Sequence, residues 1–236
     1  PAWLDSAQPW ANGGRYDILV ADPIAETPTA PNASAPNASW QRYLQDLADL
    51  HRERYSGIAP AGPRLPFCGG LLGYLGYEPG NTLHAVTQAS ATAPATPAAA
   101  IGCYDWCVVQ DHLLQRSALV TLPWVGGTLR RDLRVRFANA AKPETERPFR
   151  LRGSFQPAMT REAYQQAFAR IQAYIQAGDC YQVNLAQRFD AKYEGDPFTA
   201  YRVLREVAAA PFSGYLESSE QQAILCLSPE RFISLQ

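Results

Sequence analysis

The 236-residue sequence lacks the features of several large protein classes. Its longest apolar runs, such as Ala223 to Leu227, are too short to span a bilayer. A net charge of -1 gives no electrostatic reason to expect nucleic acid or an anionic membrane as a partner. Three histidines, at positions 51, 84 and 112, are too far apart for a HExxH motif or a zinc cluster. We therefore expect no nucleic acid, no membrane and no transition-metal site built by this chain.

Cysteine is sparse, and neither end of the chain carries a clear boundary signal. The five cysteines have no CxxC spacing, which is typical of reduced and mostly buried thiols. Reduced thiols lead us to expect a cytoplasmic protein. The start, PAWLDS, has no basic or apolar stretch typical of a secretory signal, although such a signal can be removed from a mature chain. The end, RFISLQ, stops inside a strand-like pattern, so we expect a chain truncated at both ends.

Helix and strand signals alternate, which indicates an α+β or a complex α/β fold. Helices are expected over 40–54, 128–141, 161–177 and 197–209. Strands are expected over 15–21, 65–77, 103–109, 113–122, 178–189, 212–217 and 223–227. Loops are expected over 24–39 and 87–100, with a linker over 142–157.

The clearest helix follows Thr160, a suitable N-cap, and ends before Gly178, a suitable C′ residue. Its apolar stripe consists of Tyr164, Phe168, Ile171 and Ile175. A different glycine-rich stretch, LPFCGGLLGYLGY, lacks the flanking context of a dinucleotide-binding loop. We interpret it as a buried strand with close backbone packing.

Two other stretches could carry chemistry. In GDCYQVNLAQRF, Gln182, Asn184 and Arg188 fall on one face of the expected strand, which is either a solvated face or the floor of a polar site. In LSPERF, Pro229 would fix the direction of Glu230. That carboxylate suits general acid or base chemistry, or else a salt bridge to Arg231 or to another Arg at a strand end.

Five motifs occur in the order seen in one enzyme family: LPFCGGLLGYLGYEPG, IGCYDWCVV, GDCYQVNLAQRF, APFSGYLE and LSPERF. Together they resemble the chorismate-utilising enzymes. The GDCYQVN form, and APFS in place of the NPSPY of anthranilate synthases, favour the branch of aminodeoxychorismate synthase component I. The resemblance implies an α+β fold of packed antiparallel sheets flanked by helices, here truncated. It divides the chain into an N-terminal region, 1–150, and the first part of the chorismate-binding region, 151–236.

The resemblance also implies a reaction. Enzymes of this branch aminate chorismate at C4, with ammonia from a glutaminase subunit, on the route to p-aminobenzoate and folate. Glu230 matches their general acid/base, and Gln182, Asn184 and Arg188 lie in the vicinity of the substrate site. The nucleophilic Lys of a PIKGT motif and the acidic ligands of Mg²⁺ are not found in this sequence. We expect them in the missing C-terminal half, and we expect this chain alone to be inactive.

The family further implies an aromatic-amino-acid pocket that can hold L-tryptophan. Its matching positions here are Ser6, Arg15, Tyr16, Pro211, Phe212 and Ser213. Two alternatives stay open: component I of anthranilate synthase, and a tryptophan-binding regulatory or docking fragment.

Overall fold

The computed structural model describes residues 1–32, 35–58, 65–83, 97–139, 147–219 and 222–235. They form two compact units, Pro1–Glu144 with Tyr201–Gln236, and Thr145–Ala200. This division by compactness differs from the functional one at residue 150, which stays a prediction. The mixture of helices and antiparallel strands confirms the α+β class.

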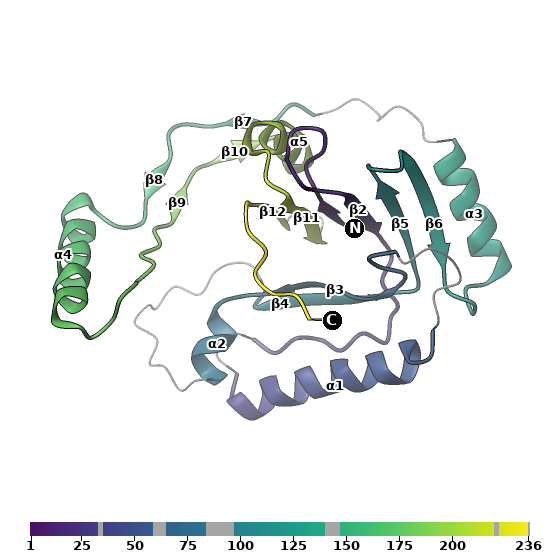
Figure 1. Ribbon diagram of the computed structural model, residues 1–236, viewed down its shortest axis with the longest axis horizontal. Coiled ribbons are helices and arrows are strands. Elements are labelled where there is room, and N and C mark those ends of the chain that lie inside the picture. The colour runs from purple at the N-terminus through teal and green to yellow at the C-terminus, as the bar shows by residue number, and fades with distance from the viewer. Residues whose placement is uncertain (33–34, 59–64, 84–96, 140–146, 220–221, 236) are drawn as a thin grey trace. The chain divides into compact units, whose positions relative to one another are not determined.

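An antiparallel six-stranded sheet dominates the first unit (Figure 1). Its strand order is β12-β11-β1-β2-β5-β6, and strands far apart in the sequence therefore lie side by side. Val20, Cys107 and Val109 are buried in its core. The bounds are β1 (Ala2–Asp5), β2 (Tyr16–Val20), β5 (Trp106–Asp111), β6 (Arg116–Thr121), β11 (Phe212–Ser219) and β12 (Gln222–Ser228).

A second, two-stranded sheet pairs β3 (Gly70–Leu75) with β4 (Ala99–Tyr104). Helix α1 (Asn37–Tyr55) runs below it in Figure 1 and buries Trp40, Tyr43 and Leu47. A Cβ added at Gly73 would lie 2.0 Å from the Ala100 carbonyl oxygen. The close backbone packing expected of the glycine-rich stretch is thereby confirmed. Two further helices are α2 (Glu78–Leu83) and α3 (Gly127–Ala138).

The strand predicted over 103–109 is wrong in one respect, because the chain changes sheets at Asp105. Residues up to Tyr104 belong to β4, and β5 begins at Trp106. The Asp105 carboxylate pairs with Arg54 of α1. The backbone carbonyl of Asp105 accepts the Leu122 N–H at 2.9 Å. These contacts hold the corner between the sheets. The loop predicted over 87–100 is wrong at its end, since Ala99 is in β4; 87–96 lie outside the described residues.

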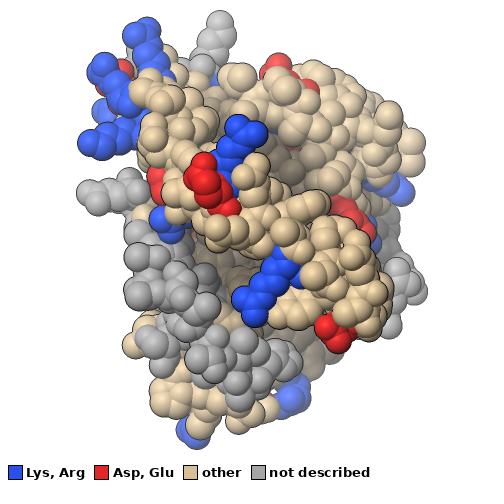
Figure 2. All heavy atoms as spheres, turned by 90° about the vertical axis from the view of Figure 1, so that its left-hand side faces the viewer, with Lys and Arg blue, Asp and Glu red and all other residues tan. Residues whose placement is uncertain are grey.

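In the second unit, α4 (Arg161–Ala177) has the predicted ends. Thr160 Oγ1 accepts the Ala163 N–H at 3.2 Å, and Gly178 has φ 84°. Two short ladders accompany it: β7 (Arg150–Leu151) with β10 (Tyr193–Glu194), and β8 (Gln156–Pro157) with β9 (Phe189–Asp190). The predicted linker thus contains β7 and β8, while 142–146 lie outside the described residues. Figure 2 looks onto the side of α4, and uncharged surface covers most of that view.

The strand predicted over GDCYQVNLAQRF is also wrong. Only Phe189–Asp190, as β9, is in a strand, and residues 181–188 have no regular structure. An alternating pattern forms a strand only where a neighbour supplies backbone hydrogen bonds. Among the described residues, the ladder of β9 with β8 ends next to Arg188, whose backbone carbonyl accepts the Ala158 N–H at 2.8 Å. Likewise, Arg231 to Leu235 carry a strand-like pattern without forming a strand.

Candidate functional site

Three segments of the first unit meet at one end of the six-stranded sheet. Asp5 of β1 pairs with Ser213 of β11, and Leu4 pairs with Ile18 of β2. Ser6 follows Asp5, Phe212 precedes Ser213 and Tyr16 begins β2, so these residues lie at the same end of the sheet. The structure therefore brings together the segments that carry all six predicted pocket residues, which are Ser6, Arg15, Tyr16, Pro211, Phe212 and Ser213.

The serines at this end are already hydrogen-bonded within the protein. Ser6 donates from its N–H at 2.9 Å and from its hydroxyl at 2.7 Å to Asp17 Oδ1. Ser213 donates its hydroxyl to the Ala210 carbonyl at 2.7 Å. A Cβ at Gly14 would come within 2.5 Å of Ser6, so this turn requires glycine. Both serines are buried, and their bonds fix the backbone rather than leave a free nucleophile.

Arg15 is bound to a buried carboxylate. Its Nη2 lies 2.8 Å from Asp111 Oδ2, and its Nε lies 3.1 Å from Oδ1. The Arg15 guanidinium also lies 4.6 Å from the centre of the Tyr16 ring. Hydrogen bonding by Arg15, with help from the N–H groups of Leu113 and Leu114, lowers the pKa of Asp111 to about 2. The ion pair therefore joins a buried carboxylate to an arginine whose side chain remains 42% exposed.

A second buried network lies beside the first and was missed by the sequence reasoning. Asp5 is 3% exposed and accepts hydrogen bonds from the Tyr201 hydroxyl at 2.8 Å and from Arg205 Nη2 at 2.6 Å. The Arg205 guanidinium lies 4.8 Å from the ring of Trp3 and 4.9 Å from that of Trp10. Arg205 lies in α5 (Pro197–Ala208), and no local pattern connects it with Asp5.

His112 also lies at this end of the sheet. The His112 Nε2 atom is buried and lies 3.1 Å from Asp17 Oδ2, but the two atoms do not have hydrogen-bond geometry. The described residues here combine three buried carboxylates, on Asp5, Asp17 and Asp111, with two arginines. The rings of Tyr16 and Phe212 stay partly exposed beside them. An aromatic ligand can stack on these partly exposed rings.

Glu230 is exposed and follows the end of β12, where Pro229 stops the strand as expected. The Ser228 hydroxyl donates to the Glu230 carbonyl at 2.9 Å. Arg231 lies 5.0 Å from the centre of the Phe212 ring, and among the described ion pairs none joins it to Glu230. Because Phe212 pairs with Ser228, the SPERF motif begins at the same end of the sheet as the PFS segment.

The three polar residues predicted near the substrate lie in the second unit. Arg188 is exposed and pairs with Asp190 at 3.1 Å. Asn184 lines a shallow hollow between α4 and residues 183–186, and Gln182 is exposed. They share no strand face, and their place beside the substrate remains a prediction. Glu230 belongs to the first unit, whereas Gln182, Asn184 and Arg188 belong to the second.

Comparison with known proteins gives the family. The sequence matches the chorismate binding enzymes over residues 1–236. The chain belongs to this family. It is 39% identical, over 228 residues and 94% of its length, to "Aminodeoxychorismate synthase component 1" of Salmonella typhimurium, covering 48% of that protein. It is 37% identical to the Escherichia coli protein of the same name, over 93% of this chain and 48% of the other. The chain thus spans about half the length of these curated relatives.

The fold agrees with the family. The structure of anthranilate synthase component I from Streptococcus pneumoniae superposes with a TM-score of 0.69 at 20% identity. The match covers 93% of this chain and 51% of the other. It confirms the expected chorismate-utilising-enzyme fold.

Two properties of the described residues bear on metals and membranes. They contain no group of three or more His, Cys, Asp or Glu side chains that could hold a metal ion. Within the same residues, no helix is long and apolar enough to cross a membrane.

Proposed function

We propose that this member of the chorismate binding enzymes contributes to component I of an aminodeoxychorismate synthase. It would aminate chorismate at C4, with ammonia from a glutaminase subunit, to give 4-amino-4-deoxychorismate. The observation that carries the proposal is the 39% identity to the Salmonella typhimurium protein over nearly the whole chain. The GDCYQVN and APFS forms of the motifs support the same branch.

In this proposal the Glu230 carboxyl group donates its proton to the departing C4 hydroxyl. The resulting carboxylate then acts as a base and accepts a proton in a later step. A carboxyl group can serve in both directions if it reaches the leaving oxygen. Glu230 is exposed, follows a strand end fixed by Pro229, and pairs with no described cation, which leaves its carboxylate available. The described residues contain no group of three or more carboxylate, His or Cys side chains that fits Mg²⁺.

The end of the sheet near Ser6 is proposed to hold an aromatic amino acid such as L-tryptophan. Tyr16 and Phe212 would sandwich the side chain, and the Asp17 carboxylate, which is bonded to Ser6 and not to an arginine among the described residues, would attract the ammonium group. Arg15 is paired with Asp111 through Nε and Nη2, but its side chain is 42% exposed and its other N–H groups would remain available for the ligand carboxylate.

The test is product identification by mass spectrometry. The full-length natural protein is incubated with chorismate, Mg²⁺ and ammonium, as wild type, Glu230→Gln and Glu206→Gln. Glu206 is an exposed carboxylate in α5 and serves as the matched control. We expect aminodeoxychorismate from wild type and Glu206→Gln, and a loss of about 100-fold or more with Glu230→Gln.

Other products would point to the other candidates. Anthranilate as the product would assign the protein to the anthranilate synthase branch. Tight binding of L-tryptophan without any turnover would assign it a regulatory or docking role, which the convergence of the six pocket positions would then explain.

A further inference from the structure

The end of the sheet that carries the proposed amino-acid pocket holds three buried carboxylates, and arginines pair with two of them. Asp5 pairs with Arg205, and Asp111 pairs with Arg15. Among the described ion pairs, none joins the third carboxylate, on Asp17, to an arginine. A carboxylate whose charge no guanidinium balances attracts a positively charged group.

The side chain that can balance this charge is His112, directly after β5. Its Nε2 lies 3.1 Å from Asp17 Oδ2, while Ser6 bonds the other oxygen, Oδ1, through its N–H and its hydroxyl. The backbone N–H of His112 donates to the Arg15 carbonyl at 2.9 Å, which holds the residue beside the start of β2. A second proton on the imidazole would therefore place a positive charge against the Asp17 carboxylate.

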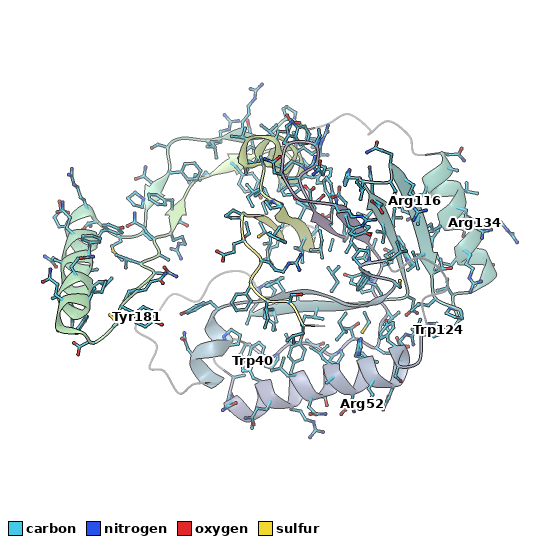
Figure 3. All side chains as sticks on the ribbon, viewed as in Figure 1. Trp40, Arg52, Arg116, Trp124, Arg134 and Tyr181 are labelled. Atoms are coloured by element: carbon cyan, nitrogen blue, oxygen red, sulfur yellow. The ribbon has the colours of Figure 1, made fainter. Side chains whose placement is uncertain are left out.

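The imidazole differs in kind from the other charged and titratable groups described around it. Histidine is the side chain whose charge ordinarily changes between about pH 5 and 8. Carboxyl groups ordinarily titrate below this range, and phenol and guanidinium groups above it. Arg116, labelled in Figure 3, lies on β6 opposite Asp111. The groups on the surrounding elements are the carboxyls of Asp5, Asp17 and Asp111, the guanidinium groups of Arg15, Arg116 and Arg205, and the phenols of Tyr16 and Tyr201.

The charge of His112 decides what the Asp17 carboxylate contributes to ligand binding. Beside a neutral imidazole, the carboxylate attracts the ammonium group of an amino acid that is stacked on Tyr16 and Phe212. Beside an imidazolium, the two charges cancel and this attraction is lost. The ammonium group does not have to touch either side chain, because charges in a partly buried site attract one another over several ångströms.

We propose that His112 makes binding at the proposed amino-acid pocket depend on pH, with tight binding when the imidazole is neutral and weak binding when it is protonated. The inference rests on the amino-acid pocket of the proposed function and adds a group that responds to acid. It requires neither chorismate nor turnover.

The test is the affinity of the full-length natural protein for L-tryptophan, measured by titration calorimetry at several pH values without chorismate. We expect wild type to bind about 10-fold more weakly at about pH 5.5 than at about pH 8. His112→Gln removes the titrating ring, so its affinity should change by less than about 2-fold over this range. His51→Gln, at an exposed position in α1, is the matched control and should keep the wild-type dependence.

A second ligand and a second variant separate the effect of charge from a change in the shape of the pocket. Indole-3-propionate keeps the ring and the carboxylate of L-tryptophan but lacks the ammonium group, so its binding should not weaken in acid. Asp17→Asn keeps an oxygen for the Ser6 hydrogen bonds and removes the charge. This variant should bind L-tryptophan more weakly at about pH 8 and lose the pH dependence.

The outcomes distinguish this inference from the proposed function. If L-tryptophan binds with an affinity that does not change with pH, or if His112→Gln keeps the wild-type dependence, the inference is overturned and the proposed pocket stands. Equal weakening of indole-3-propionate in acid would also overturn it. Absence of L-tryptophan binding at every pH would overturn the pocket and this inference together, whereas the amination of chorismate is tested by its own product.

Discussion

Asp5 in β1 and Arg205 in α5 are 200 residues apart in the sequence and form a buried ion pair. The pair ties the helix to the end of the strand from which Ser6 continues. Arg205 is 9% exposed, and the Asp5 side chain is fully buried. The position of the candidate amino-acid pocket therefore depends on a contact between the two ends of the chain.

Removal of one partner should strongly destabilise the protein. Arg205→Ala would leave the Asp5 carboxylate buried without its counter-charge, which typically costs about 3 to 5 kcal/mol. The measurement is the shift of the unfolding midpoint in urea. Arg42→Ala is the control, because Arg42 and Asp46 form an exposed pair at 3.5 Å, whose loss should cost at most about 1 kcal/mol. Equal effects of the two substitutions would show that the Asp5–Arg205 pair contributes no more than a surface contact.

Asp111 should make the free energy of unfolding depend on pH in the acidic range. Its pKa is lowered from an ordinary 3.8 to about 2, mainly by Arg15. Because the folded pKa lies below the unfolded one, the contribution is complete above about pH 4 and is lost as the pH falls toward 2. We expect the stability difference between wild type and Asp111→Asn to shrink over this range, as followed by denaturation at each pH. Asp132→Asn, at an exposed position in α3, should show no such convergence. A constant difference for Asp111→Asn would contradict the assignment.

Local signals predicted some elements well and others poorly, for a physical reason. Helix α4 carries its own start and stop, in Thr160 and Gly178, and both act within one turn of the chain. The alternation in GDCYQVNLAQRF is not sufficient to form a strand, because a strand needs a neighbouring strand, and the local sequence does not show which segment that would be. The corner at Asp105 likewise depends on Arg54, 51 residues away.

The candidate site likewise combines features that could be predicted from the sequence with features that could not. The pairing of β1 with β2 and β11 puts Ser6, Tyr16 and Phe212 at one end of the sheet, while their role as a pocket, which the family resemblance implies, stays a prediction. The contacts that hold them there could not be predicted, because Asp17, Asp111 and Arg205 belong to separate elements. Nothing in the sequence near Asp5 indicates that its partner is Arg205.

The cysteines should differ sharply in reactivity. Cys103 and Cys107 are buried, and burial raises the pKa of Cys107 to about 12, which removes its thiolate at neutral pH. Cys226, in β12, is exposed. We expect iodoacetamide at pH 8 to modify Cys226 first and to leave Cys103 and Cys107 unmodified, as read by peptide mass spectrometry. In denaturant all five cysteines should react, and early native labelling of Cys107 would contradict its burial.

The cap of α4 should contribute measurably to the local stability of the second unit. Thr160 Oγ1 accepts the Ala163 N–H, so Thr160→Ala removes an acceptor that the first helical turn cannot replace. The expected loss is about 1 kcal/mol, seen as faster hydrogen exchange of the α4 amides. Thr160→Ser keeps the oxygen and is the matched control, with exchange close to wild type. Because no residue of α4 is buried, few tertiary contacts can compensate for the lost cap. Unchanged exchange in Thr160→Ala would therefore mean that something other than this cap holds the start of the helix.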